Sequence, residues 1–332
     1  MYRDLREEVN KAPGRRESPS RTEKNMEKQE KQAIEILHMM CGNNGCVISD
    51  SGVKDSSVLK HIALKTKNMY GLECKIRHNH TTVDAPETVY FIRKEKQKYE
   101  AMGIPYEIFY PVETMWQLIV RHGTPPTRKM RYCCKDLKEN TGIGEKLVTG
   151  VRKAESRNRK ENQGIVTITN PKKELLSKIE ENENFLLTDK GGVIVLNLDN
   201  SETRRTVENC YRTQKTLINP LIDWDDDFLY WYIRKEEIEL NELYDCGWNR
   251  VGCIGCLLAG KHRWKEFERY PKYKDAYIRA FDRMIIERKR RKLKVGDMWS
   301  TGKKVFKWWM EDENLDGQLA FDLYGNIYEE YI

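Results

Sequence analysis

The sequence has no long hydrophobic run. None approaches the roughly 20 apolar residues needed to cross a bilayer, although 39% of the 332 residues are hydrophobic and 10% are aromatic. The amino-terminal stretch is charged and has no apolar core of the kind found in secretory signals. Nine cysteines in a chain without such a signal favour a reducing cytoplasm and metal or redox roles for the thiols. We therefore expect a cytoplasmic protein with no membrane partner.

Two common nucleotide-binding motifs are absent as well, since neither G-x-x-x-x-G-K-[ST] nor G-x-G-x-x-G occurs. Basic residues are absent from the end of the chain, where no Lys or Arg follows Lys307. The formal net charge of +7 is concentrated instead between Lys261 and Lys307, where 17 Lys and Arg residues accompany 6 Asp and Glu residues. This basic region 261–307 is either a nucleic-acid-binding patch or an ordinary solvated helix surface.

Apolar runs typical of buried strands alternate with amphipathic stretches typical of helices through the first half of the chain. This alternation predicts an α/β fold with a mainly parallel, doubly wound sheet and helices on both faces. Such sheets bind ligands at the carboxyl ends of their strands, so we expect the loop at Ser51, Asp84 and Gly150 to converge. The expected strands are Cys46–Ile48, Leu72–Arg77, Ile104–Tyr110 and Leu147–Val151.

Composition divides the chain into four segments. Residues 1–25 are polar and are expected to form a disordered arm, and residues 26–159 form the nucleotide-binding domain. Residues 160–210 are predicted to be an insertion with a hairpin at Gly191-Gly192; it would cover the nucleotide cleft or select the acceptor, and take no part in the central sheet. Residues 211–332 form a C-terminal helical region with a cysteine pair, the basic region and an acidic tail.

A loop of small residues follows the first expected strand and has the sequence Ser49-Asp50-Ser51-Gly52-Val53-Lys54-Asp55-Ser56. A helix is expected from Asp55 to about Thr66, so its N-terminus and the loop N–H groups would surround one point and favour an anion there. Ser49, Ser51 and Ser56 can donate hydrogen bonds to phosphate oxygens, and Lys54 supplies a full positive charge. The alternative is an ordinary strand-to-helix turn with an Asp or Ser cap.

Four cysteines form two pairs, Cys133-Cys134 and the C-x-x-C pair Cys253 and Cys256. Together they offer four thiolates, a donor set that suits zinc or an iron–sulfur cluster. Adjacent cysteines point apart and close poorly around one small ion, whereas a cluster has corners several ångströms apart. The alternative is a set of unrelated buried thiols.

The loop resembles the S-G-G-x-D-S loop of the PP-loop ATP pyrophosphatases, with Val53 where the second glycine usually stands. Three further segments, in the same order, resemble the phosphoadenosine phosphosulfate (PAPS) reductase family. They are R-x-C-C-x-x-L-K at 131–138, G-V-R-x-x-E-S-x-x-R at 150–159, and P-L-I-D-W at 220–224 followed by G-x-x-R-x-G-C-x-x-C at 247–256.

This resemblance implies an adenine nucleotide α-hydrolase-like fold that binds ATP or an adenylyl nucleotide, with Mg²⁺ as a further cofactor. It implies catalytic roles for Lys54, Asp55 and Arg152, and a [4Fe–4S] cluster, with zinc as the second choice, on Cys133, Cys134, Cys253 and Cys256. The implied nucleotide-binding residues are Ser49, Ser51, Gly52, Ser56, Asp84, Gly150, Ser156 and Arg159.

Three of these residues also have a physical rationale. Arg152 is expected to start a helix after a strand, where its guanidinium can bind a phosphate or sulfate through two hydrogen bonds. Arg159 would lie two turns further along the same helix face, unless it forms only a surface salt bridge. Asp84 is expected either to bind the adenosine or a metal, or to cap the helix that Pro86 opens.

The sequence departs from the reductases in its tail, since residues 257–332 contain no cysteine to attack a sulfonucleotide. We therefore expect cleavage of ATP between its α- and β-phosphates, coupled to sulfur transfer. The alternatives are a sulfonucleotide reductase that uses Cys210 or Cys246, or a non-catalytic nucleotide-dependent regulator that binds nucleic acid. The expected partners are the adenine nucleotide, an electron or sulfur donor protein, and a nucleic-acid acceptor bound by the basic region.

Overall fold

The computed structural model describes residues 23–42, 45–139, 141–142, 144–179, 182–296, 299–311, 320–321 and 327–328. The predicted disordered arm lies outside this range apart from its last residues, where helix α1 (Glu23–Cys41) begins. Most of the predicted acidic tail also lies outside it. None of the described helices combines the length and the apolar character that a membrane span requires.

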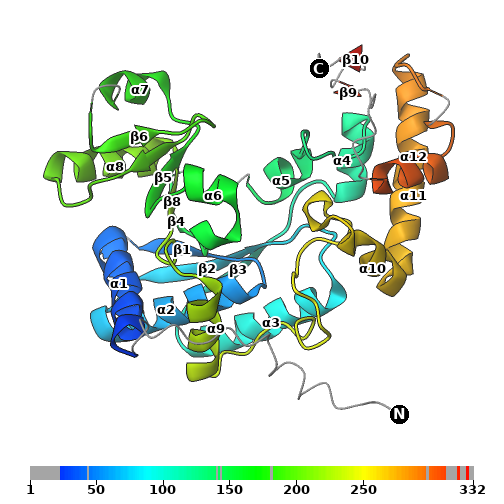
Figure 1. The fold of residues 1–332 in the computed structure, drawn as a ribbon. Helices are drawn as coiled ribbons and strands as arrows, with labels where there is room; N and C mark the ends of the chain where they lie inside the picture. The colour runs from blue at the N-terminus through cyan, green and yellow to red at the C-terminus, as the bar shows by residue number, and fades with distance from the viewer. Residues whose placement is uncertain are drawn as a thin grey trace, which may run out of the picture.

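Figure 1 shows strands and helices alternating along the chain. The strands of the main sheet are β1 (Cys46–Asp50), β2 (Cys74–Asn79), β3 (Tyr106–Phe109), β4 (Lys146–Val148), β5 (Val166–Thr169), β6 (Phe185–Leu187), β7 (Val193–Val195) and β8 (Lys215–Ile218). The further helices are α2 (Lys54–Tyr70), α3 (Pro86–Ala101), α4 (Met115–His122), α5 (Tyr132–Leu137), α6 (Arg157–Asn162), α7 (Lys173–Ile179), α8 (Ser201–Thr213), α9 (Asp226–Lys235), α10 (His262–Arg269), α11 (Pro271–Arg290) and α12 (Gly302–Met310). Short β9 (Ala320–Phe321) and β10 (Ile327–Tyr328) pair separately.

The main sheet has eight strands in the order β3-β2-β1-β4-β8-β5-β7-β6. The pairs from β3 to β8 are parallel and the pairs from β8 to β6 are antiparallel. The predicted α/β fold with a mainly parallel sheet is confirmed. The chain leaves β1 for β2 and β3 on one side and returns to β4 on the other, so the order reverses between β1 and β4. In open α/β sheets, ligands bind in the crevice at such a reversal.

The prediction that residues 160–210 take no part in the central sheet is wrong. Strand β5 pairs with β8 along its whole length, and β7 and β6 extend the sheet beyond it. Val166, Ile168 and Val193 are fully buried, so these strands belong to the main core. The predicted hairpin at Gly191-Gly192 is confirmed, because β6 and β7 are antiparallel neighbours.

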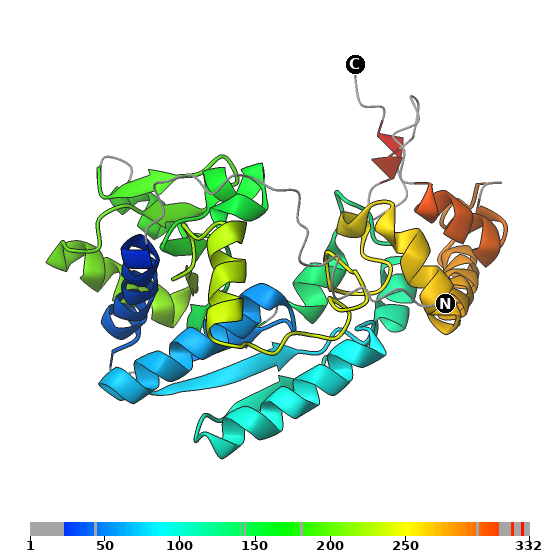
Figure 2. The ribbon, with the colours of Figure 1, turned by 60° about the horizontal axis from the view of Figure 1, so that its bottom comes forward.

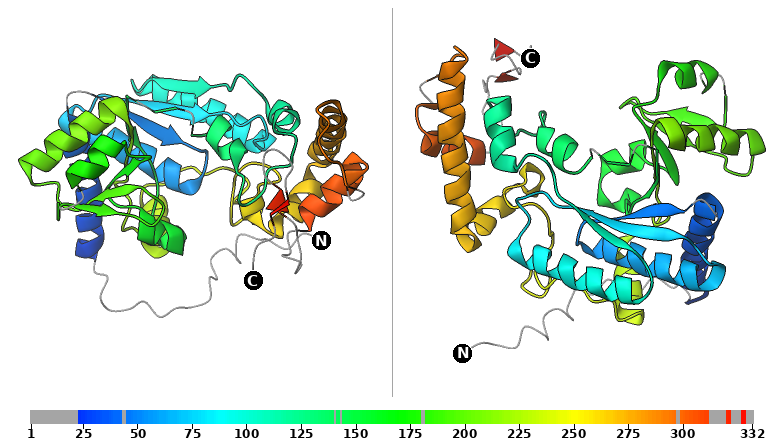
Figure 3. Two further views of the ribbon diagram at one scale, coloured as in Figure 1. Left: turned by 90° about the horizontal axis from the view of Figure 1, so that it is seen from above. Right: turned by 180° about the vertical axis from the view of Figure 1, so that it is seen from behind.

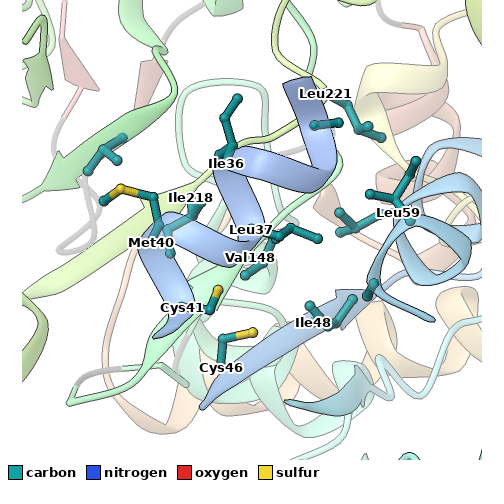
Figure 4. Packing of buried hydrophobic residues seen from close by; sticks show 14 of the residues in the cluster. Ile36, Leu37, Met40, Cys41, Cys46, Ile48, Leu59, Val148, Ile218 and Leu221 are labelled. Atoms are coloured by element: carbon teal, nitrogen blue, oxygen red, sulfur yellow. The ribbon is translucent and has the colours of Figure 1, made fainter. Parts of the chain in front are cut away.

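Two hydrophobic cores hold the molecule together. The first lies between the sheet and helices α1, α2, α8 and α9, and Figure 4 shows how Leu37, Ile48, Leu59 and Val148 meet in it. The second is rich in aromatic side chains and joins α4, α5 and α10–α12 around Trp309. Figures 1 and 3 show these helices on the side of the molecule opposite to α7 and α8. We call them the helical lobe.

The helical lobe is assembled from distant parts of the sequence. Two of its helices are separated at Pro271, since α10 ends at Arg269 and α11 begins at Pro271. The lobe meets the sheet where the segment after β2 pairs with the segment of the second cysteine pair. There Asp84 and Cys253 form an antiparallel bridge, and Ile254 N–H donates to the Val83 carbonyl at 2.8 Å.

We predict that Ile168→Ala lowers the free energy of unfolding by about 2–5 kcal/mol, because it empties a fully buried site in β5. The matched control is Leu187→Ala on edge strand β6, where the side chain is 60% exposed and the change should stay within about 0.5 kcal/mol. Urea denaturation measures both values. If both variants change the free energy of unfolding by equally small amounts, residues 160–210 do not contribute to the main core.

Candidate active site

Asp50, the last residue of β1, organises the loop predicted to bind nucleotide. Its Oδ1 accepts from the backbone N–H of Gly52 at 2.8 Å and from the hydroxyl of Ser56 at 2.9 Å. The Ser56 hydroxyl accepts in turn from the N–H groups of Ser51 (3.3 Å) and Val53 (3.2 Å). Ser56 therefore holds the loop together from within, whereas Ser49 is half-buried and Ser51 is exposed.

The second oxygen of Asp50 faces a buried lysine. Lys60 Nζ lies 2.5 Å from Asp50 Oδ2 and 2.8 Å from Glu95 Oε2, and Tyr106 donates to Asp50 Oδ2 at 2.6 Å. All of these charged side chains are almost fully buried. Burial by itself would raise the pKa of Asp50, but the charge of Lys60 and the hydrogen bonds from Lys60 and Tyr106 lower it to about 2. Asp50 is therefore ionised at neutral pH.

Gly52 is required for two reasons. Its φ is +70°, and a Cβ there would lie 2.9 Å from Thr88 Cγ2 on α3. Gly150, after β4, faces a similar limit, since its Cβ would lie 3.0 Å from the Asp55 carbonyl oxygen. The ends of β1 and β4 therefore pack closely, and the predicted convergence of Gly150 with the loop is confirmed.

Lys54, the predicted phosphate-binding cation, is the first residue of α2. The residue before the helix is Val53, which provides no side-chain cap, so the Asp or Ser cap of the alternative interpretation is not formed at that position. The backbone N–H of Lys54 donates to the Tyr244 hydroxyl at 3.2 Å. Lys54 Nζ lies 3.2 Å from Asp55 Oδ2 and 3.9 Å from Asp226 Oδ1. Tyr244 and Asp226 were not predicted, since nothing in their local sequence sets them apart.

The predicted helix starting at Arg152 and running through Arg159 is wrong. A 3-10 turn (Lys153–Glu155) follows Arg152, and α6 begins afterwards at Arg157, with Ser156 as its cap. Ser156 Oγ accepts from the Arg159 backbone N–H at 3.3 Å. Because the chain is extended at Ser156, Arg152 precedes the 3-10 turn and Arg159 lies on α6.

Arg152 is buried, and protein groups already satisfy its guanidinium. It donates to Asp55 Oδ1 (2.5 Å), to Asp226 Oδ1 (2.8 Å) and to the Trp224 carbonyl (3.2 Å). Asp226 is the exposed member of this set, with 61% of its side chain accessible. Arg152 can therefore reach a phosphate only where the phosphate takes the place of Asp226.

Arg159 lies close to the same group of charges. It forms an ion pair with Glu155, as the salt-bridge alternative predicted. Burial lowers the pKa of Arg159; Asp55 counteracts this effect, while the charges of Arg152 and Arg250 add to it. The α2 N-terminus, both predicted arginines and Arg250 thus share one electrostatic environment.

Asp84 does not cap α3. The residue before that helix is Ala85, and the Asp84 carboxylate instead accepts from the N–H and the hydroxyl of Thr81, both at 2.7 Å. It lies beside the second cysteine pair, because Cys253 Sγ is 3.4 Å from Thr81 Oγ1. Asp84 therefore stabilises the turn that meets this pair.

The first cysteine pair sits in the first turn of α5. Tyr132, which precedes it, is stacked on His122 with ring centroids 4.0 Å apart, and its hydroxyl donates to the Thr124 carbonyl at 2.7 Å. These contacts tie α5 to α4 and fix the direction in which Cys133 and Cys134 leave the helix.

The second cysteine pair lies in a tight turn anchored to the helical lobe. Gly255 has a φ of +77°, and a Cβ there would lie 2.8 Å from Phe267 Cζ. Its N–H donates to Glu266 Oε2 at 2.6 Å. Arg250 donates to Cys256 Sγ at 3.7 Å, so the same guanidinium lies near a cysteine and near Arg159.

The two predicted cysteine pairs are about 120 residues apart in the chain, yet the charges of Cys253 and Cys256 act on Cys133. A hydrogen bond with Cys134 raises the pKa of Cys133, and burial and the charges of Cys253 and Cys256 raise it further. The same hydrogen bond lowers the pKa of Cys134 to about 6. All four side chains are half-buried, unlike ordinary core thiols.

These thiols do not form a closed single-ion site. In the part of the chain that the structure describes, no three His, Cys, Asp or Glu side chains lie close enough to hold one metal ion. The donor set itself is all sulfur, with cationic Arg250 and Lys138 beside it; a Cys253 thiolate raises the pKa of Lys138. Four sulfur donors suit either zinc or an iron–sulfur cluster.

Cys210 and Cys246, the two cysteines that the reductase alternative could use, occupy very different positions. Cys210 on α8 is 2% exposed in the main core, where burial raises its pKa to about 11. Cys246 is exposed in the turn that follows Tyr244. Of these two, Cys246 alone is accessible to a substrate.

Comparison with known families decides the assignment. The model of the phosphoadenosine phosphosulfate reductase domain matches residues 45–259, which span β1 to the second cysteine pair. The chain belongs to this family. The PAPS reductase domain thus includes both the nucleotide loop and the four cysteines, and it excludes α10–α12.

Individual relatives of this PAPS reductase domain are distant. An uncharacterized protein of Methanocaldococcus jannaschii is 25% identical over 246 residues, 70% of this chain and 48% of the relative. The adenosine 5'-phosphosulfate reductase of Bacillus cereus is 30% identical over 86 residues, 25% of this chain and 37% of the enzyme. The chain therefore spans about half, or less, of the length of these curated relatives.

Two solved structures are weakly similar to the chain. The PAPS reductase from Candida auris, in a phosphate complex, has a TM-score of 0.43 and 17% identity, covering 72% of this chain and 98% of that one. The U34-tRNA thiolase NcsA from Methanococcus maripaludis, with its [4Fe-4S] cluster, has a TM-score of 0.42 and 14% identity, covering 84% and 88%. Both likenesses are weak and distinguish no function within the fold.

We predict that Asp50→Asn removes part of the acid sensitivity of the fold. A carboxyl group whose pKa falls from 3.8 to about 2 on folding stabilises the native state above pH 4, and this contribution is lost as the pH falls toward 2. It amounts to about 2 kcal/mol. Unfolding free energies measured between pH 5 and pH 2.5 should decline less steeply in the variant, and equal slopes would contradict the assignment.

Proposed function

We propose that the protein binds ATP or an adenylyl nucleotide at residues 49–56 and cleaves it between the α- and β-phosphates, coupled to sulfur transfer onto an acceptor. One observation carries this proposal: the Arg250 guanidinium donates a hydrogen bond to Cys256 Sγ, and its charge also acts on Arg159 and on Tyr244, whose hydroxyl accepts from the Lys54 N–H at the α2 N-terminus. Family membership supports the adenine nucleotide, since the matched domain is a sulfonucleotide reductase domain.

The loop supplies the phosphate site. The α2 N-terminus carries partial positive charge, and Lys54 adds a full charge beside it. Adenine-nucleotide complexes occur among proteins of similar fold, such as the FMN adenylyltransferase of Candida glabrata with ATP. Here Asp55 would remain on Arg152, while the exposed carboxylate of Asp226 would give way to a phosphate.

The proposed reaction begins when an acceptor oxygen attacks the α-phosphorus in line with the leaving pyrophosphate. The P–O bond to the β-phosphate breaks, pyrophosphate departs, and the acceptor oxygen loses its proton to solvent. Hydrosulfide supplied by a donor protein then attacks the activated acceptor atom, the bond from that atom to the AMP oxygen breaks, and AMP departs. Lys54 and Arg152 would stabilise the charge that develops on the phosphate oxygens, and Mg²⁺ bound with the nucleotide would add to this.

Cys133, Cys134, Cys253 and Cys256 would hold a [4Fe–4S] cluster, with zinc as the second choice. When bound, the cluster would fix the two halves of the site together or carry the sulfur. This chain's own part is to hold four thiolates beside two cations, Arg250 and Lys138, which offset their negative charge.

A sulfonucleotide reductase is the second candidate, and the exposure of Cys246 is the observation that favours it. This thiol lies two residues from Tyr244, whose hydroxyl contacts the α2 N-terminus. Its thiolate would attack the sulfur of a sulfonucleotide, releasing the nucleotide, and a dithiol protein would then release sulfite.

Lys54→Met should weaken ATP binding about 10- to 150-fold, the loss expected for one charge-assisted hydrogen bond to phosphate. Isothermal titration calorimetry measures the affinity, and pyrophosphate release measures turnover. Lys67→Met, at the opposite end of α2, is the matched control and should bind like the unaltered protein. If both variants bind ATP equally, the loop is not the nucleotide site.

Anaerobically purified protein should contain iron and acid-labile sulfide in equal amounts and should absorb visible light. Cys256→Ser should lose the iron and unfold more readily, since metal binding contributes to folding free energy. Cys246→Ser is the control and should keep the iron; it should also keep turnover with ATP, whereas the reductase alternative requires that turnover with a sulfonucleotide be lost. One tightly bound zinc without sulfide would contradict the cluster.

A further inference from the structure

The basic region of the helical lobe contains two kinds of cation. Some are structural: Arg263 donates to the Trp309 carbonyl and lies over its ring at 4.2 Å, and Arg288 donates to the Gly123 carbonyl at 2.7 Å. Others are paired with carboxylates: Arg269 with Glu87, Arg290 and Arg291 with Glu287, and Lys307 with Glu311. These six cations need no external partner.

The remaining cations are exposed on the surface and have no ion pair within the described chain. They lie on α10, along the roughly 30 Å of α11, on the segment after it and on α12. They are Lys261, Lys265, Lys272, Lys274, Arg279, Arg283, Lys289, Lys292, Lys294, Lys303 and Lys304. Figure 2 shows these helices together on the side of the molecule away from α1.

Large apolar side chains are exposed between these cations and the second cysteine pair. Trp264 on α10 is 48% exposed, and Leu258, two residues after Cys256, is 49% exposed. Lys261 and Lys265 lie three residues before and one residue after Trp264, and both are exposed. We call Leu258, Lys261, Trp264 and Lys265 the α10 patch.

The α10 patch is continuous with the candidate active site. The His262 ring packs against Trp248 with centroids 4.6 Å apart, and the Ala259 N–H donates to the Cys256 carbonyl at 2.8 Å, so the start of α10 lies directly after the second cysteine pair. Arg250 also donates a hydrogen bond to Cys256 Sγ, and its charge lowers the pKa of Arg159. A ligand that covers Trp264 would therefore lie beside the second cysteine pair.

We propose that the α10 patch binds a single-stranded segment of nucleic acid and that this strand is the acceptor; the proposal rests on the function proposed above. An exposed indole between two lysines matches the pattern of base stacking combined with phosphate contacts. The unpaired cations of α11 and α12 would then follow the strand's phosphates away from the site. An acidic peptide would use the lysines but would leave the indole and Leu258 exposed.

The test measures the affinity of the full-length protein for a labelled single strand by fluorescence anisotropy. DNA and RNA of one sequence are compared, which shows which of the two the protein prefers. Trp264→Ala should weaken binding to the preferred strand about tenfold. Tyr70→Ala, an exposed aromatic at the far end of α2, is the matched control and should have no effect.

Charge is tested separately. The Lys261→Ala/Lys265→Ala double variant should lower the slope of log affinity against log salt by about 1.4, the value for two lost single-strand phosphate contacts. The control pair Lys173→Ala/Lys178→Ala removes two exposed lysines from α7 and should leave the slope unchanged. The proposal is wrong if each variant behaves like its control, or if duplex DNA and polyglutamate compete as well as the single strand.

Calorimetry with ATP on the same variants keeps this proposal separate from the proposed function. Trp264→Ala should bind ATP normally while its strand binding is weakened. If the unaltered protein binds ATP but no strand, the α10 patch proposal fails alone. If it binds a strand but no nucleotide, the proposed function fails, and with it the role of the strand as acceptor.

Discussion

The ionised carboxylate of Asp50 is the constraint on which the site depends. One of its oxygens fixes the Gly52 N–H and the Ser56 hydroxyl, and the other is held by Lys60 and Tyr106. A buried ion pair of this kind adds little net stability compared with apolar side chains, but it is costly to break. Its consequence here is geometric, because these contacts fix the backbone of the loop at the end of β1.

The second constraint is the junction between the two hydrophobic cores. The loop predicted to bind nucleotide follows a strand of the sheet, whereas the cysteine pairs pack with the helical lobe. The bridge between Asp84 and Cys253 and the hydrogen bond from Ile254 to Val83 join them. In the proposed site, phosphate binding and sulfur coordination would therefore come from different elements of the chain.

The sequence predicted those parts of the site that have a local signature. The loop around Lys54 and the two cysteine pairs were found because their residue types and spacing are unusual, and β1–β3 because their apolar runs are bounded by helical patterns. Strands β5 and β8 were missed because each has only four residues and pairs with a partner far along the chain. Lys60 and Glu95 were missed because such residues in an amphipathic helix are normally exposed. Arg250 lay inside a matched motif, but only the fold showed that it faces both halves of the site.

The charges around the α2 N-terminus show how such a site is held without its ligand. Two cations that would bind phosphates, Lys54 and Arg152, are neutralised by Asp55 and Asp226. The two carboxylates differ in kind, because Asp55 is nearly buried and Asp226 is largely exposed. A buried charge pair resists separation, whereas an exposed one loses little when its carboxylate moves into water. A phosphate bound as proposed would displace Asp226 from Arg152, while Asp55 would stay on Arg152 and beside Lys54.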